Sequence, residues 1–363
     1  MQLRSFWKTA LWRFAGPGVS FVGQVYAISG SRDLSYQRSV FFVLAAQVLI
    51  NSTDFPYFIA ARKEAPRQIH PLYLPACLLS VVVAYISGAV HDTVELAYCF
   101  ALTLAVSLFS GIYSTELNGG LARTTIIGTL RNTVIAGLLV LFTLRRTEVL
   151  ITSALIFVGF IVYRRLSMKS QRKDVQQLSW QETLLSVLAA VLTGVFFLSD
   201  RYFIVETFQE HTRLVNQIFV AISVVLLLSN VSAVHLSGRS IITRVARYAW
   251  MQLIVVATLF ALATIVFVAN QERLLICIVL IATPVVFSLQ SPYLLGIQER
   301  RSVASTAASY VAIFGLKVIS FFALSNAEGG ERLVYFIPLL GLFSPLLIVL
   351  ISQYSGIRHS NHA

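Results

Sequence analysis

The stretch YRRLSMKSQRKDVQQLSWQE, residues 163–182, divides this sequence into two halves of similar character. Six apolar stretches precede it and six follow it, so this polar, basic segment interrupts an otherwise apolar chain. We therefore predict two halves, residues 1–165 and 182–363, joined by a basic connector at residues 166–181.

The composition indicates which solvent the apolar stretches meet. Of the 363 residues, 57% are hydrophobic and 12% are charged, and the mean hydropathy is +0.77. Soluble domains of this size are more polar. A membrane-spanning helix needs about 20 apolar residues to cross about 30 Å of hydrocarbon, so twelve spans would leave only short loops. The sequence predicts an all-α polytopic membrane protein of about 12 transmembrane helices in two six-helix bundles, without a soluble catalytic domain.

The apolar runs place the spans to within about three residues at each end. The first span is diluted by Gly16, Pro17, Gly18 and Gly23 and the sixth is short, so ten spans would remain if both failed. The expected spans are Trp12–Ser29, Ser39–Ala61, Leu72–Val90, Val94–Thr115, Thr125–Leu144, Val149–Tyr163, Thr183–Val205, Leu214–Leu236, Tyr248–Ala269, Leu274–Gly296, Val303–Leu324 and Leu333–Gln353.

The basic residues predict the orientation, because short loops rich in Lys and Arg stay on the cytoplasmic side. Alternate loops hold nineteen basic residues on one side and seven on the other, so both termini are expected in the cytoplasm. The side with nineteen holds Arg4, Lys8, Arg13, Arg62, Lys63, Arg67, Arg123, Arg131, Arg164, Arg165, Lys169, Arg172, Lys173, Arg239, Arg244, Arg247, Arg300, Arg301 and Arg358. The other side holds Arg32, Arg38, Arg145, Arg146, Arg213, Arg273 and Arg332, and it gathers the acids Asp92, Glu95, Glu206, Glu210, Glu328 and Glu331.

The net charge of +12 is explained by this topology signal and by attraction to anionic lipid headgroups, so we expect membrane lipid as a partner and no nucleic acid. Residues 1–12 read as an interfacial anchor and not as a cleavable signal, because Gly16, Pro17 and Gly18 interrupt the first apolar segment. The three cysteines, Cys77, Cys99 and Cys277, fall within expected spans, which argues against disulfides.

Charged residues inside the expected spans mark where function should be sought, because each is costly in hydrocarbon. Asp200 and Arg201 are adjacent in the seventh span and point about 100° apart on a helix, so they do not pair with each other. Lys317 in the eleventh span is the natural partner for Asp200. This pairing would leave Arg201 to face an aqueous cavity and bind an anion; the alternatives are that Arg201 extends to the outer interface and that Lys317 only bridges Asp200.

The remaining charges lie nearer the expected inner face. Asp54 is in the second span, and Arg13 and Arg131 are at the inner ends of the first and fifth, where topology signalling is their simplest role. Helix breakers suggest bends in several spans: Pro17, Pro56, Pro284, Pro292, Pro338 and Pro345. We find no catalytic residues, no metal-ligand spacing and no cofactor motif, and expect a protein that is not an enzyme.

Two short motifs resemble one family. FLSDRYFI at residues 197–204 and Thr53-Asp54-Phe55 followed by Ala60-Ala61-Arg62, together with two six-span halves, resemble the polysaccharide-transporter (O-antigen flippase-like) branch of the multidrug/oligosaccharidyl-lipid/polysaccharide flippase superfamily. The resemblance implies a V-shaped architecture in the bacterial inner membrane. It implies alternating-access transfer of a polyprenyl diphosphate-linked oligosaccharide to the outer leaflet for surface polysaccharide synthesis. Polysaccharide polymerase and chain-length machinery are further partners that it implies.

The resemblance also implies roles for particular residues. Arg201, Arg13, Arg131 and Lys317 would bind the diphosphate, and Asp54 or Asp200 would carry a coupling proton or a structural charge. Two other function classes stay open: a small-molecule exporter of the same superfamily, and a membrane acyltransferase or polymerase of polysaccharide assembly. Residues expected to contact sugar hydroxyls are Gln24, Tyr26, Gln47, Asn51, Tyr57 and Tyr202.

Overall fold

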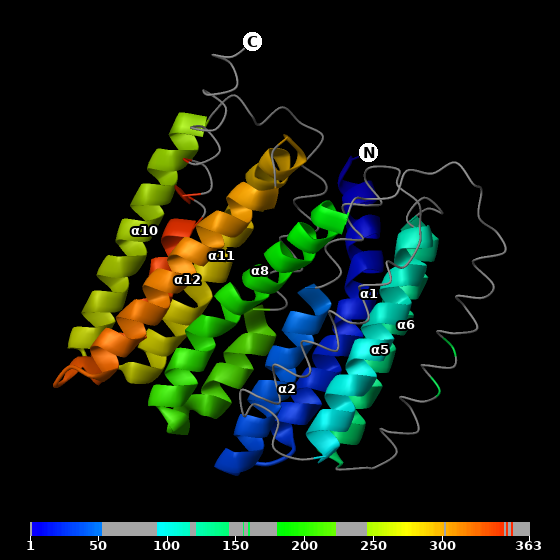
Figure 1. Ribbon diagram of the computed structural model, residues 1–363, viewed down its shortest axis with the longest axis horizontal. Helices are drawn as coiled ribbons and strands as arrows, with labels where there is room; N and C mark the ends of the chain where they lie inside the picture. Colours follow the sequence, from blue (N-terminus) through cyan, green and yellow to red (C-terminus); the bar gives the residue numbers. More distant parts are fainter. Residues whose placement is uncertain are drawn as a thin grey trace. The chain divides into compact units, whose positions relative to one another are not determined.

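The computed structural model describes residues 2–52, 93–116, 121–144, 155, 159, 180–222, 245–300, 303–344, 346–347 and 350, and all regular secondary structure within them is helical (Figure 1). The predicted all-α class is confirmed for this part of the chain. Among these residues, no helix combines the length and the apolar character needed to cross a membrane.

The helices follow the predicted order, and α5 and α12 match their expected spans to within one residue at each end. The third expected span, nearly all of the sixth, the latter parts of the second and eighth, and most of the connector lie outside the described residues. The elements are α1 Gln2–Ser29, α2 Leu34–Ser52, α5 Thr93–Glu116, α6 Leu121–Thr143, α8 Trp180–Thr207, η2 Gln209–His211, α10 Val245–Val268, α11 Glu272–Arg300, α12 Val303–Ser325 and η4 Gly330–Phe343. Residues 212–222 are also helical.

Helices α1 and α11 continue through sequence features that suggested an interruption, while the bends expected at their prolines stay predictions. Helix α1 starts at Gln2, so the segment expected to be a separate anchor continues into the first apolar run. Pro17 lies inside α1, and α11 continues from Glu272 to Arg300 through Pro284 and Pro292. A proline removes one backbone hydrogen bond from a helix, and packing against neighbouring helices can compensate for that loss.

The chain divides into two compact units, residues 1–191 and 192–363, with the boundary inside α8. In the first unit, α1 packs along α6, and α5 contacts α6 and α2 (Figure 1). The α1–α6 contact is close because a β-carbon added to Gly23 would lie 2.8 Å from Ala136 Cα, and one added to Gly16 would lie 2.9 Å from Asn132 Nδ2. These contacts advance together along both helices, so α1 and α6 are parallel. Gly16 and Gly23, two of the glycines that dilute the first apolar run, therefore lie on its packing face, whereas Gly18 meets no atom within 4 Å.

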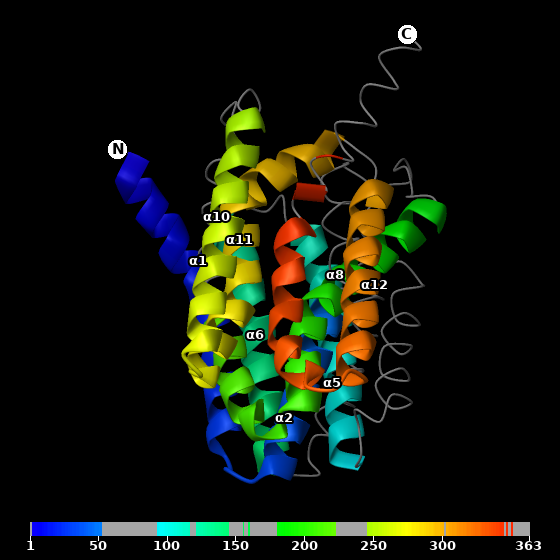
Figure 2. The same cartoon turned by 90° about the vertical axis from the view of Figure 1, so that its left-hand side faces the viewer.

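In the second unit, η4 packs against α11 and α12, and α10 packs against α11 (Figure 2). The turn between α10 and α11 ends with Asn270 in the left-handed region at φ 54°, and Gln271 N donates to Val266 O at 3.3 Å. This is the hydrogen-bond pattern of a Schellman cap. Before η4, Gly329 has φ 72°, and a β-carbon on Gly330 would collide with Leu324 O, so this tight turn requires its two glycines.

The twelfth expected span differs from an ordinary α-helix. Its first part, Gly330–Phe343, is a 3₁₀ helix of 14 residues, and α-helical geometry begins only at Ser344. Pro338 lies inside it and lacks the backbone donor that an α-helix would use there. The apolar run therefore predicted a helix at the right place but not its winding.

Candidate functional site

Three of the charged residues singled out in the sequence lie together in the second unit. Lys317 Nζ on α12 donates to Asp200 Oδ1 on α8 at 2.5 Å, and these residues are 0% and 4% exposed. The ion pair that we predicted between them is confirmed. Two charges buried this completely are stable only as a pair, because either one alone would remain unsolvated.

The pair lies in a seam of aromatic contacts between α8 and α12. Phe196 packs on Tyr310 with ring centroids 4.9 Å apart on one side of the pair, and Phe203 stacks on Phe321 at 4.5 Å on the other. On α8, Phe196, Asp200 and Phe203 have the spacing i, i+4, i+7 of a single helix face. The aromatic side chains therefore set the register that brings Lys317 opposite Asp200 and keep water from the pair.

Lys317 has partners on several sides. Its ammonium lies 4.0 Å from the centroid of the Phe196 ring and 3.4 Å from Phe196 O. A β-carbon added to Gly341 on η4 would lie 3.2 Å from Lys317 Nζ, so this glycine leaves room for the ammonium. The charge of Lys317 is thus occupied by Asp200, by an aromatic face and by a carbonyl.

Arg201 occupies a different face of α8. The residue is 5% exposed, and its Cζ lies 4.2 Å from the centroid of the Phe219 ring in the helical residues 212–222. Within the described part of the chain, no carboxylate forms a salt bridge with this guanidinium. The alternative in which Arg201 extends to the outer interface does not agree with this burial. The three charges therefore sum to a buried excess of one positive charge, carried by a group with five hydrogen-bond donors.

The other sequence-predicted site residues do not join this cluster within the described residues. Arg13 lies on α1 about one turn before Gly16, and Arg131 lies on α6 next to Asn132, so the two residues are about one turn apart along the α1–α6 pair in the first unit. Arg131 is half-buried, and Asp54 lies outside the described residues. Their predicted roles stay predictions.

Of the six polar residues expected to contact sugar, Tyr57 and the side chain of Asn51 lie outside the described part of the structure, and the other four fall into two groups. Gln24 and Gln47 are buried at 6% and 4% exposure, and the Oε1 atom of each has no hydrogen-bond donor among the described residues. Tyr26 and Tyr202 are 42% and 43% exposed. Contact of these four residues with sugar stays a prediction.

A second polar cluster in the second unit was not found from the sequence. His211 Nε2 lies 3.6 Å from Glu272 Oε2 and 3.8 Å from Glu210 Oε1, and Phe208 stacks on Tyr335 with ring centroids 4.2 Å apart. A cavity of about 10 Å³ beside Tyr335 is lined by residues of the α10–α11 turn and η4, and it has room for about one water molecule.

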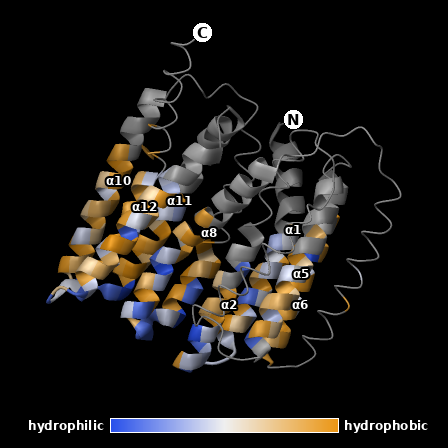
Figure 3. Cartoon of the chain, viewed as in Figure 1, coloured by the Kyte–Doolittle hydropathy of each residue, from blue (hydrophilic) through white to orange (hydrophobic). Residues whose placement is uncertain are grey.

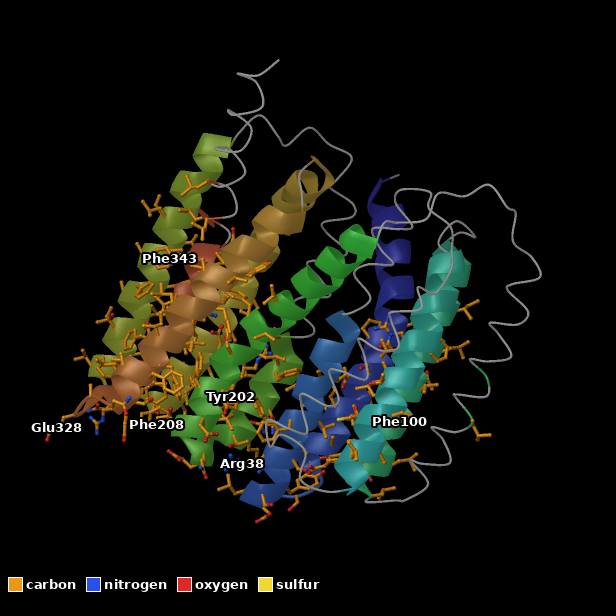
Figure 4. All side chains as sticks on the ribbon, viewed as in Figure 1. Arg38, Phe100, Tyr202, Phe208, Glu328 and Phe343 are labelled. Atoms are coloured by element: carbon orange, nitrogen blue, oxygen red, sulfur yellow. The ribbon has the colours of Figure 1, made fainter. Side chains whose placement is uncertain are left out.

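The members of this second cluster come from three separate segments, 208–211, 270–272 and 330–335, so no local motif marks them. The sequence did contain one indication of this cluster: the predicted topology assigned all three segments to the same side of the membrane. Figure 4 labels Phe208 and Glu328 toward the same end of this unit and Phe343 toward the other. Among the described residues, no group of His, Cys, Asp and Glu side chains could hold a metal ion.

Comparisons of the chain with protein-family models, with curated proteins and with solved structures found no match. The functional assignment therefore rests on the sequence and on the geometry of these residues.

Proposed function

We propose that this protein is a membrane flippase that moves a polyprenyl diphosphate-linked oligosaccharide from the cytoplasmic to the outer leaflet for surface polysaccharide synthesis. The observation that carries the proposal is Arg201, a guanidinium that is 5% exposed and has no salt bridge to a carboxylate among the described residues. A buried cation without a counterion favours an anionic ligand, and guanidinium binds phosphate oxygens in a bidentate manner.

The Asp200–Lys317 pair supports this assignment because it leaves the positive charge of Arg201 without a carboxylate partner among the described residues. Asp200 is the nearest acid in sequence to Arg201, and its Oδ1 already accepts a hydrogen bond from Lys317 at 2.5 Å. Because Asp200 and Lys317 neutralise each other, the cluster retains the single positive charge of Arg201, which suits a diphosphate better than the cationic or neutral cargo of a small-molecule exporter.

A membrane location is part of the proposal and rests on the whole sequence and on exposed apolar side chains. No described helix meets the requirement for spanning. On α10, however, Ile254, Ile265 and Val268 lie on one face and are 63%, 66% and 74% exposed, and on α12 Ile319 and Phe322 are 68% and 60% exposed. Apolar faces of this kind are covered by lipid or by a partner. Along the coloured helices of Figure 3, hydrophobic residues dominate the middle and hydrophilic residues gather at the turns.

The proposed cycle uses two six-helix halves that rock about a central site, with both termini in the cytoplasm. The glycan and its diphosphate would cross between the halves while the polyprenyl tail stays in lipid. Arg13 and Arg131, about one turn apart along α1 and α6, would receive the diphosphate at the inner mouth. Asp200, held by Lys317, would keep Arg201 in position.

The test is the sidedness of lipid-linked oligosaccharide in cells depleted of the protein. Accessibility to an external glycan-modifying enzyme should fall on depletion, and expression of the wild-type chain should restore it. Export of a lipid-linked sugar that is altered in acylation or chain length would instead identify a membrane acyltransferase or polymerase. If accessibility is unchanged and the glycan is normal, the flippase assignment is wrong and a small-molecule exporter becomes the leading candidate.

A further inference from the structure

The 3₁₀ helix η4 is far longer than is usual for this conformation. It runs for 14 residues, from Gly330 to Phe343, whereas 3₁₀ runs beyond three or four residues are uncommon because their hydrogen-bond geometry is poor. Three residues per turn place Tyr335, Pro338 and Gly341 in one row along the helix. Contacts with residues outside the segment must therefore favour the 3₁₀ winding, and this row of three residues makes such contacts.

Each member of the row makes a specific contact. The Tyr335 ring stacks on Phe208 at 4.2 Å with an interplanar angle of 8°. Pro338 O accepts a hydrogen bond from Thr283 Oγ1 of α11 at 3.0 Å. Gly341 faces Thr283 and Lys317 so closely that a β-carbon would lie 2.9 Å from Thr283 Cγ2 and 3.2 Å from Lys317 Nζ. The 3₁₀ winding is therefore the one that presents a glycine to the paired lysine.

An α-helical winding would present a leucine at the same place. Ser344 after η4 is already α-helical, and Pro338 is suited to the first turn of an α-helix, so α geometry could extend back as far as Pro338. Three residues of a 3₁₀ helix and four of an α-helix both rise about 6 Å, so Leu342 would reach the level that Gly341 now holds. At 100° per residue, Leu342 would also turn to within about 40° of the direction of Gly341. Its side chain would collide with Lys317 in the paired position.

We propose that residues 338–343 are a two-state element, 3₁₀ while Lys317 is paired with Asp200 and α-helical once Lys317 has left that position. The lysine excludes Leu342, and in its absence the better hydrogen bonding of the α-helix is available. This inference rests on the proposed function in one respect: an anion bound beside Arg201 would compete with Asp200 for Lys317 and so release the switch. Gly341 is then a positioning residue that admits Lys317 to the pair.

The test is disulfide cross-linking of Thr283→Cys with Leu342→Cys in full-length protein in native membranes, with Cys77, Cys99 and Cys277 replaced. In the paired state Leu342 faces about 120° away from Gly341, so the cross-link should be weak. Adding Asp200→Asn or Lys317→Ala should raise the cross-linked fraction several-fold. Glu328→Gln is the matched control, since it removes an exposed carboxylate just before η4 and should leave the fraction unchanged.

Cross-linking is scored only for variants that are as abundant in the membrane as the double-cysteine parent. Two different variants, Asp200→Asn and Lys317→Ala, are used so that the test does not depend on the folding of either one. An unchanged fraction in either variant at full abundance overturns the two-state inference, whatever transport assays show. Inorganic diphosphate is then added to the otherwise unsubstituted double-cysteine protein. A rise in cross-linking supports coupling of the anion to the switch. A rise in the variants but none with diphosphate keeps the switch and counts against the diphosphate site of the proposed function.

Discussion

At the scale of single residues, Arg201 is the group on which the proposed function depends. It is buried, lies on the Phe219 ring at 4.2 Å and forms no salt bridge within the described residues. Arg201→Ala should reduce export of lipid-linked oligosaccharide at least 10-fold, since a charge-assisted bidentate contact is worth about 1.5 to 3 kcal/mol. Arg201→Lys should retain part of the activity because lysine keeps the positive charge. It should not retain all of it, because lysine lacks the planar guanidinium that binds phosphate through two hydrogen bonds.

Membrane abundance separates a binding role for Arg201 from a folding role. The matched control is Arg273→Ala, which removes an exposed arginine from the first turn of α11 and should leave export unchanged. Export by Arg201→Ala at the wild-type rate and abundance would remove Arg201 from the site.

The Asp200–Lys317 pair predicts a different response. Asp200→Ala leaves a buried lysine without its counterion and should destabilise the protein by about 3 to 5 kcal/mol, seen as a lower unfolding temperature in detergent. The exchange Asp200→Lys with Lys317→Asp should recover part of the stability lost in either single change. Stability of the double variant no better than that of the worse single variant would mean that the contact is not energetically important.

At the scale of elements, the parallel packing of α1 on α6 depends on a glycine. A β-carbon on Gly23 would lie 2.8 Å from Ala136 Cα, which is backbone and cannot move away by itself. Gly23→Ala should therefore destabilise the protein by about 1 to 3 kcal/mol through overpacking. Gly18→Ala on the same helix meets no atom within 4 Å and should be neutral or slightly stabilising. Equal unfolding temperatures for the two variants would contradict this packing.

The element boundaries show which local signals are reliable. α5 and α12 could be placed to within one residue because their apolar runs have sharp polar ends, Asp92 before the first and Arg301 and Ser302 before the second. Helix α1 begins ten residues before the first expected span because the LRSFWKTALWRF run, residues 3–14, is polar enough to end an apolar window yet contains no helix breaker. Apolar content marks where a chain avoids water, and helix formation does not stop at that boundary.

At the scale of the whole molecule, the topology can be tested without an assay of transport. Single cysteines at Glu328, in the exposed turn before η4, and at Lys169, in the predicted connector, should report opposite sides. We expect a membrane-impermeant maleimide to label Glu328→Cys in intact cells and Lys169→Cys only after the membrane is opened, because the basic connector is predicted to be cytoplasmic. Labelling of both positions in intact cells would overturn the proposed orientation.

In the second unit, turns that alternate along the chain lie together, as the predicted order of helices requires. His211, Glu272 and Tyr335 follow three different helices in the chain and lie in one cluster, as expected if the turns between 207 and 212, 268 and 272, and 325 and 330 share one side. The order of the apolar runs carried this information, because consecutive antiparallel helices bring alternate turns to the same end of a bundle. It could not identify the contacts, since His211 and Glu272 are 61 residues apart in the sequence.

The sequence by itself determined the helical class, the order of the helices and the likeliest partner of Asp200. These follow from the cost of burying charges and backbone groups, which acts on each residue according to its own chemistry. Tertiary structure alone decided that Gly16 and Gly23 of α1 lie on a packing face, that η4 winds as a 3₁₀ helix, and that Gly341 leaves room for Lys317. These outcomes depend on contacts between atoms from distant parts of the chain, where a difference of one β-carbon decides which packing is possible.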